Sequence, residues 1–222
     1  MIYLLIIIFI YFNFVNSSIV IAGKCSEGVI ISSDSLFSQS GRIVSSREAV
    51  KVHNLTGDVL VCYVGGRGAE FSSLCLDLDG VILQERYHGD GNHADTCQCT
   101  ELAHLTRRLV YSAYRSVHVI IVGRDISHDN NNNNADKYHL YEILPGGTII
   151  DAPFIVAGSG AESVLGLLEE KLNVKTINND NNKNDAYDGG LKALEDTITN
   201  AVKTAIRVDP RSGGVPRTYI FR

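Results

Sequence analysis

The chain has 222 residues, of which 45% are hydrophobic and 20% are charged, so its composition is that of a globular protein and excludes a disordered chain. The length fits a single domain. The formal net charge of −5 lacks the basic excess that nucleic-acid binding requires, and we expect no nucleic-acid partner.

Residues 1–16 form a nearly continuous apolar segment. The segment is long enough for a signal peptide and short for a membrane-spanning helix, but it lacks a basic region and a small-residue cleavage site. Three interpretations stay open: a leader or propeptide that is removed, a membrane anchor, or a translated intron or misassigned first exon. We expect residues 1–17 to be a leader or a misassigned segment, and residues 18–222 to form one domain.

Residues 18–35 predict a β-hairpin. β-Branched residues fill two apolar runs, and the Gly- and Ser-containing stretch 24–28 supplies a turn between them. Antiparallel pairing brings Ser18, at the head of the first strand, beside Asp34, at the foot of the second. This pair is a candidate site, although an Asp followed by Ser is also common at ordinary turns.

The chain then continues with connections, a buried strand and two helices. Polar composition predicts a connection at 38–47 and a turn at 54–58, and the run VLVCYV predicts a strand at 59–64. The glycine cluster at 65–68 lacks the Lys-Ser/Thr of a phosphate-binding loop, so it predicts close approach of the backbone to a ligand or an oxyanion and not to a nucleotide. Amphipathic periodicity predicts helices at 69–84 and 100–114.

The second half of the chain repeats this order. Apolar runs predict strands at 117–122, 138–143, 148–150 and 154–156 and a last strand from 217, with helices at 162–172 and 191–208. Asn-rich tracts at 125–136 and 178–185 are typical of insertions in loops. Because each amphipathic helix must cover a sheet face, we expect an α+β fold of four layers, αββα, in which two antiparallel sheets are flanked by helix pairs.

The cysteines indicate neither disulfides nor a metal site. Their number, five, is odd, and they are scattered through apolar segments, which favours buried free thiols. Cys97 and Cys99 are separated by one residue and not by the two that are usual in zinc sites, and the sequence has no second cysteine pair to complete such a site. We therefore expect no metal.

Five spaced blocks together resemble a proteasome beta subunit, of the N-terminal-nucleophile (Ntn) hydrolase fold. In chain order the blocks are GVIISSDS, the Lys of AVKV, VGGRGAE, FIVAGSGAE and DPRSGGV, and the resemblance extends from about Ser18 to Ile220. It implies that the first residue of the mature chain carries a hydroxyl nucleophile. The freed α-amine, with a pKa of about 8, would act as the base, with water as a shuttle.

By position in these blocks, the resemblance implies that Ser18 is the nucleophile, with Asp34 and Lys51 beside it. Asp34 would hold the Lys51 cation, which lowers the proton affinity of its neighbours. The implied supporting hydroxyl and carboxylate groups are Ser159, Asp209 and Ser212.

The resemblance also implies a substrate-binding region. The backbone N–H of Gly66 takes the place of the oxyanion donor, and Val64 lies near the base of the pocket for the residue before the scissile bond. Residues 212–217, SGGVPR, resemble the end of the caspase-like catalytic subunit. Val64, however, does not supply the basic residue of that subtype, and its chemistry favours apolar or medium-sized side chains.

The sequence departs from the family pattern around the nucleophile. Active members begin with Thr preceded by Gly, whereas Ser18 follows Ser17, and Ile19 stands where a second Thr is common. One residue is also inserted between Asp34 and Lys51. Serine supplies the same hydroxyl and lacks only the methyl group that restricts the χ1 angle of threonine.

The resemblance implies hydrolysis of peptide bonds in unfolded polypeptides through an acyl ester on Ser18, without a cofactor. We expect the chain to assemble with other proteasome alpha and beta subunits in stacked heptameric rings of the 20S core, in the cytoplasm and nucleus, and not to be a membrane protein. One alternative is a non-catalytic structural beta subunit. Another is a secreted or membrane-anchored binding module with glycosylation sequons at Asn16 and Asn54.

Overall fold

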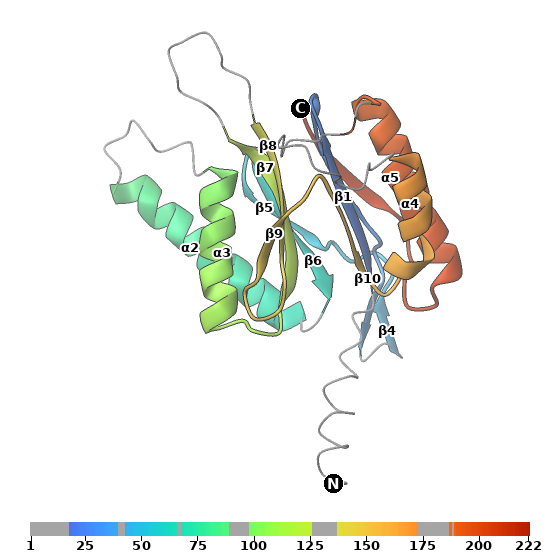
Figure 1. Ribbon diagram of the computed structural model, residues 1–222. Helices are drawn as coiled ribbons and strands as arrows, with labels where there is room; N and C mark the ends of the chain where they lie inside the picture. Colours follow the sequence, from blue (N-terminus) through green and yellow to red (C-terminus); the bar gives the residue numbers. More distant parts are fainter. Residues whose placement is uncertain are drawn as a thin grey trace, which may run out of the picture.

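A computed structural model describes residues 18–39, 43–65, 68–88, 98–125, 137–172, 187 and 189–222. Two antiparallel sheets lie face to face, and each outer face is covered by helices (Figure 1). The described residues therefore confirm the predicted α+β sandwich with αββα layers.

The first sheet contains the predicted hairpin. Its strand order is β10-β1-β2-β11, with β1 at Ile19–Cys25, β2 at Gly28–Ser33, β10 at Phe154–Gly158 and β11 at Arg217–Phe221. Val20 lies opposite Ser33 and Cys25 opposite Gly28, which confirms the pairing of the two apolar runs. The 3-10 turn η1 at Ala161–Ser163, α4 at Leu165–Lys171 and α5 at Leu191–Val208 lie on the outer side.

The second sheet has the order β5-β6-β7-β8-β9. Its strands are β5 at Val52–Thr56, β6 at Val59–Gly65, β7 at His118–Asp125, β8 at Lys137–Ile143 and β9 at Ile149–Asp151. The helices α2 at Gly68–His88 and α3 at Cys99–Ser112 cover its outer face (Figure 1). This sheet and its helices contain the predicted strands at 59–64, 117–122, 138–143 and 148–150 and the predicted helices at 69–84 and 100–114.

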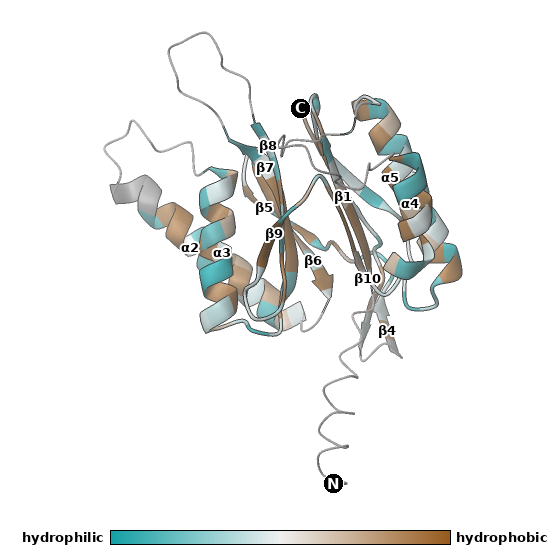
Figure 2. Ribbon diagram, viewed as in Figure 1, coloured by the Kyte–Doolittle hydropathy of each residue, from teal (hydrophilic) through white to brown (hydrophobic). Residues whose placement is uncertain are grey.

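Three apolar clusters join the four layers. One lies between the sheets and contains Val20, Ile31, Cys62 and Ile120, and each of the others lies between a sheet and its helices. Figure 2 shows the strands of both sheets largely in brown, whereas the helices carry both colours. The helical periodicity of α5 is confirmed, because the residues of its predicted apolar stripe are all buried: Leu191, Leu194, Ile198, Ala201, Val202 and Ala205.

The predicted connection at 38–47 is wrong, and the predicted turn at 54–58 is too long. Residues 38–47 are not an irregular connection, because β3 at Phe37–Gln39 pairs with β4 at Ile43–Ser46. Residues 54–58 are not all turn, because β5 continues to Thr56 and pairs with β6. Leu55 and Thr56 are buried in the folded chain, so pairing and burial override the turn preference of the flanking Asn and Gly, and the turn itself is confined to Gly57 and Asp58.

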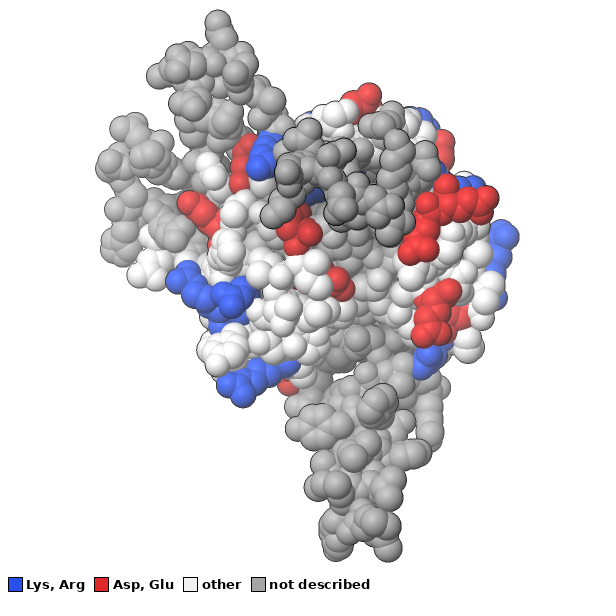
Figure 3. Space-filling model, viewed as in Figure 1, with Lys and Arg blue, Asp and Glu red and all other residues white. Residues whose placement is uncertain are grey.

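The surface carries both signs of charge. On the face shown in Figure 3, acidic side chains gather over α4 and α5 and basic side chains over α3. Within the described ranges, no helix is long and apolar enough to cross a membrane. The same residues contain no group of three His, Cys, Asp or Glu placed to hold a metal ion. Cys25, Cys62, Cys75 and Cys99 are free and buried, and Cys97 lies outside the described residues.

Candidate active site

The hairpin brings Ser18 and Asp34 into direct contact. Asp34 follows the end of β2, and the main-chain N–H of Asp34 donates to the carbonyl O of Ile19 at 3.1 Å, which ties the two strand ends together. The hydroxyl Oγ of Ser18 then donates to Asp34 Oδ1 at 3.0 Å, and both residues are fully buried. A hydroxyl and a carboxylate sixteen positions apart in sequence are therefore neighbours in the fold.

Lys51 brings a buried cation to this pair. It immediately precedes β5, and its ammonium Nζ donates to Asp34 Oδ1 at 2.6 Å and to Ser18 Oγ at 2.8 Å. Only 2% of Lys51 is exposed, so solvent screens its charge weakly. A cation this close to a hydroxyl favours the alkoxide over the neutral alcohol, which is the requirement for a nucleophile.

Backbone amides hold the Asp34 carboxylate in place. The N–H of Ile19 donates to Oδ1 at 3.1 Å, and the N–H groups of Leu36 and Gly213 donate to Oδ2 at 3.3 and 3.0 Å. Together with Ser18 and Lys51 these amides satisfy both oxygens of a carboxylate that has no access to water. The amides of Leu36 and Gly213 are functional groups that the sequence analysis missed, because a backbone amide leaves no residue-type signal.

Ser159, Asp209 and Ser212 form a second group beside the first. Ser159 Oγ donates to Asp209 Oδ2 at 2.5 Å, and Ser212 Oγ donates to the same oxygen at 2.7 Å. Burial raises the pKa of Asp209, but hydrogen bonds from Ser159, Ser212 and the N–H of Arg211 outweigh burial, so the pKa lies below its ordinary value. Asp209 is therefore an anion that orients both hydroxyls.

The two groups meet at the backbone of Ser18. The N–H of Ser18 donates to Ser159 Oγ at 3.3 Å, and the carbonyl O of Ser18 accepts from the N–H of Gly160 at 3.3 Å. Since the Ser159 proton is directed to Asp209, a lone pair of Ser159 Oγ faces the nitrogen of Ser18. If the bond before Ser18 were cut, the new amine would lie within hydrogen-bond reach of Ser159.

Gly158 permits this close approach, and its replacement tests it. Its φ angle is +104°, and an added Cβ would lie 2.2 Å from the carbonyl O of Ser18. We expect Gly158→Ala to lower the free energy of unfolding by about 2–4 kcal/mol, because it combines backbone strain with a clash against backbone.

The matched control is Gly166→Ala in α4, where an added Cβ meets nothing within 4 Å. This control should stabilise the chain by up to about 1 kcal/mol through helix propensity. Thermal or denaturant unfolding compares the two variants. Equal stabilities would contradict the close packing of Gly158 against Ser18.

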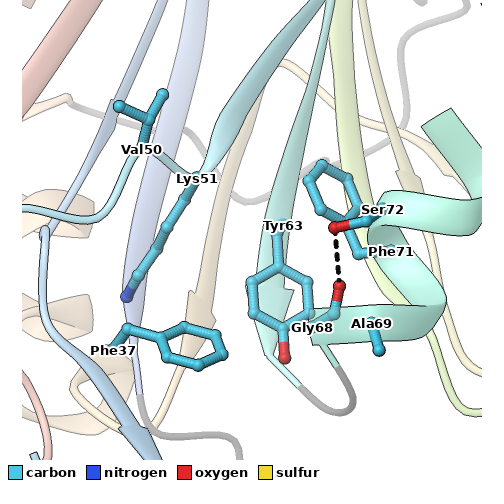
Figure 4. Close-up of a pocket in the computed structure, with 8 residues that line it drawn as sticks. All are labelled: Phe37, Val50, Lys51, Tyr63, Gly68, Ala69, Phe71 and Ser72. Atoms are coloured by element: carbon cyan, nitrogen blue, oxygen red, sulfur yellow. Dashed lines mark hydrogen bonds between the residues drawn. The ribbon is translucent and has the colours of Figure 1, made fainter. Parts of the chain in front are cut away.

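A cavity of about 320 Å³ adjoins the ammonium of Lys51. Figure 4 shows Phe37, Lys51 and Tyr63 around it, with the start of α2 on the far side. The lining residues are Phe37, Val50, Lys51, Tyr63, Gly68, Ala69, Phe71 and Ser72. The Tyr63 and Phe71 rings pack with their centroids 5.2 Å apart. Three of the eight lining residues are aromatic, and we call this space the aromatic cavity.

The structure does not place Val64 in this cavity. Successive side chains of a strand point to opposite faces. Tyr63 of β6 faces the cavity, whereas Val64 is fully buried in the cluster between the sheets. Tyr63 and Phe37 were not predicted to line a pocket. For Tyr63 the sequence held a signal, because side chains alternate along a strand and Tyr63 must therefore face the side opposite to Val64. Gly66, the predicted oxyanion donor, lies outside the described residues.

The four-layer sandwich carries a hydroxyl, that of Ser18, directly before β1, and Lys51 donates to it. This arrangement is that of the N-terminal-nucleophile hydrolase fold. A family model described as "Proteasome subunit" matches residues 15–209. The chain therefore belongs to the proteasome subunit family and is a beta subunit.

Individual relatives are similar over most of their length. "Proteasome subunit beta 1" of Desulfurococcus amylolyticus is 29% identical over 196 residues, which cover 86% of this chain and 82% of the relative. "Proteasome subunit beta type-6" of Arabidopsis thaliana is 29% identical over 200 residues, with coverage of 87% and 72%. "Proteasome subunit beta 1" of Thermococcus gammatolerans is 28% identical over 192 residues, with coverage of 85% and 81%.

Proposed function

We propose that this beta subunit of the 20S core is catalytic and hydrolyses peptide bonds in unfolded polypeptides. The observation that carries the proposal is the contact of Lys51 Nζ with both Ser18 Oγ and Asp34 Oδ1, at 2.8 and 2.6 Å, in a buried site. A structural subunit has no need of a buried ammonium beside a hydroxyl, because burying an ion pair costs several kcal/mol of desolvation.

Residues of the site can carry out each covalent step of the proposed peptide hydrolysis. After release of the segment before it, Ser18 Oγ attacks the substrate carbonyl carbon, and the Oγ proton passes through water to the α-amine of Ser18. The same proton then goes to the leaving amine as the peptide C–N bond breaks, which leaves an ester on Ser18. Water hydrolyses the ester and restores the hydroxyl. Lys51 stabilises the alkoxide character of Oγ, and Ser159 holds the amine.

A second candidate function is a structural beta subunit that keeps its leader. It is favoured by the complete burial of Ser18 while the chain continues before it, and by Ser17 in the place of the family's Gly. The mature N-terminus separates the two candidates. We expect mass spectrometry of the purified particle to find a chain that begins at Ser18. A chain that retains residues 1–17 in an assembled particle would leave only the structural function.

We further propose that the aromatic cavity takes the side chain that precedes the scissile bond. Lys51 belongs to both the cavity and the nucleophile group, so a substrate carbonyl at Ser18 Oγ directs its neighbouring side chain there. Burial, with a smaller effect of Glu70, raises the pKa of Tyr63 to about 12, so the phenol stays neutral. The aromatic lining favours an apolar side chain of medium size.

Replacing Tyr63 tests this pocket. Tyr63→Ala should enlarge the cavity and raise kcat/KM for cleavage after aromatic residues, relative to cleavage after Val, by about ten-fold or more. Tyr111→Ala is the control, because Tyr111 is 63% exposed on α3 and should leave the ratio unchanged. Peptide libraries that differ only at this position measure the ratio. An unchanged ratio in Tyr63→Ala would place the pocket elsewhere.

The assembly and location are also proposals. We propose that the chain occupies a stacked heptameric ring together with other alpha and beta subunits, in the cytoplasm and nucleus. Membership of the proteasome subunit family supports assembly with other subunits.

A further inference from the structure

Ser35 connects two segments that lie far apart in the sequence. Its hydroxyl Oγ donates to the carbonyl O of Arg47 at 2.6 Å and accepts from the N–H of Val215 at 2.8 Å. Its carbonyl O accepts from the N–H of Ala49 at 2.9 Å, and its own N–H donates to the carbonyl O of Gly213 at 3.2 Å. Ser35 is fully buried, and each of its polar groups bonds to one segment or the other.

The first segment leads to Lys51. Residues 47–51 join β4 to β5 outside any strand, and Val50 is 61% exposed, so neither strand pairing nor burial of Val50 fixes this approach. At its far end the segment is held by β6, where the N–H of Tyr63 donates to the carbonyl O of Lys51 at 2.7 Å. The two bonds of Ser35 hold the near end. The place of the ammonium that contacts the nucleophile therefore depends on them.

The second segment carries an amide that binds the catalytic carboxylate. The N–H of Gly213 donates to Asp34 Oδ2 at 3.0 Å. Ser35 holds this segment through the carbonyl O of Gly213 and the N–H of Val215. Ser35 also follows Asp34 directly in the chain. The lysine and the amide that meet at this carboxylate therefore come from two segments fastened to the residue beside it.

Gly214 shows how closely these segments pack. Its φ angle is +75°, and an added Cβ would lie 2.3 Å from Ser35 Oγ and 2.4 Å from the carbonyl O of Arg47. Glycine adopts this φ angle readily and leaves the space that the hydroxyl and the carbonyl occupy. The backbone is therefore closely fitted around the hydroxyl of Ser35.

We propose that Ser35 is a positioning residue of the active site, which sets the places of Lys51 and of the Gly213 amide relative to Asp34. The inference rests on the proposed catalytic function. An error of about 1 Å in the place of a catalytic group can cost about 100-fold in rate, so the bonds of this hydroxyl should matter for turnover. Substrate binding should depend on them less, because the residues that line the aromatic cavity do not include Ser35.

Ser35→Ala tests the role of the hydroxyl. The two residues that lose a bond, Arg47 and Val215, are exposed, so water can satisfy them and the subunit should still assemble. In assembled particles we expect kcat for peptides cleaved by this subunit to fall about ten-fold or more, with KM changed less than about two-fold. Ser35→Cys keeps a weak donor and a weak acceptor, and its kcat should lie between those of wild type and Ser35→Ala.

Ser46→Ala is the matched control. Ser46 Oγ accepts from the N–H of Glu48 at 3.1 Å in an exposed bond of the same connection, and its loss should leave kcat unchanged. Wild-type kcat in Ser35→Ala, or a loss confined to KM, would overturn the proposal. Failure of both Ser35 variants to assemble would assign this residue a role in folding and would overturn it too.

Two further measurements separate this inference from the proposed function. In the same assay, activity that survives Ser18→Ala would contradict the proposed function, whereas activity that is lost in Ser18→Ala and intact in Ser35→Ala would contradict the positioning role alone. Crystallography of Ser35→Ala particles needs no activity. It should show Lys51 Nζ displaced from Ser18 Oγ, which lies 2.8 Å away in the wild type. An unchanged position of Lys51 would overturn the proposal.

Discussion

Replacing Ser18 by alanine should reduce the peptide hydrolysis that depends on this chain by about 1,000-fold or more, because no atom remains to form the acyl ester. The neighbouring groups stay satisfied, since Lys51 and Asp34 still pair at 2.6 Å and Asp34 keeps its backbone donors. The loss should therefore appear in activity and not in assembly. The measurement compares hydrolysis by particles that differ only in this residue.

Two controls separate the loss of a nucleophile from the loss of a buried hydroxyl. Ser18→Thr keeps the hydroxyl and should retain activity. Ser32→Ala removes an equally buried hydroxyl from the same sheet, bonded to Thr218, and should also retain activity. Full activity in Ser18→Ala would show that hydrolysis comes from another residue or another subunit.

Lys51→Met should cause the second largest effect, on activity and stability together. Methionine approximates the length of the lysine stem but leaves the Asp34 carboxylate buried without its cation. Removing one partner of a buried ion pair costs about 3–5 kcal/mol. Ser18 also loses the donor 2.8 Å from its Oγ, so we expect a loss of activity of about 100-fold or more.

Lys24→Met is the matched control for Lys51→Met. Lys24 pairs with Asp151 at 2.9 Å, and the Asp151 side chain is 52% exposed, so this pair should contribute less than about 1 kcal/mol. Lys51→Arg keeps the charge but cannot place a compact ammonium between two oxygens, and it should assemble with reduced activity. Subunit stability and hydrolysis are measured on the same preparations. If Lys51→Met behaved like Lys24→Met, the ammonium would have no part in the reaction.

Local patterns were sufficient for much of the fold. The helical period of residues 191–208 predicts α5 to the residue, because one stripe of that segment is apolar and the structure buries that stripe. The two β-branched runs around a Gly and Ser turn predict the hairpin of β1 and β2. In both segments propensity and burial favour the same structure, so the sequence is locally consistent with the fold.

Local patterns failed where pairing decides the structure. The stretch 38–47 is polar, yet β3 and β4 pair there, and no periodicity marks them. Phe37 at the start of β3 lines the cavity, so the missed hairpin also hid a residue of the pocket. Val64 was predicted beside the substrate pocket, whereas its neighbour Tyr63 lines the aromatic cavity. On a strand, a difference of one position moves a side chain to the opposite face.

The candidate site is assembled by contacts between distant parts of the chain. Ser159 and Asp209 are fifty positions apart and bond at 2.5 Å, and Gly213 donates to Asp34 across 179 positions. Composition and spacing suggest neither contact. The resemblance to a family supplied Asp34, Ser159 and Asp209, and the folded sandwich supplies their geometry and adds the amide of Gly213.

The central claim is that Ser18 Oγ forms the acyl ester, and trapping that ester tests it most directly. The reaction with a labelled peptide substrate is quenched in acid, and the modified residue is identified by tandem mass spectrometry. The predicted result is a mature chain that begins at Ser18, with a free α-amine and the acyl group on Ser18 Oγ. An uncut bond between residues 17 and 18, or an acyl group on any other residue, would contradict it.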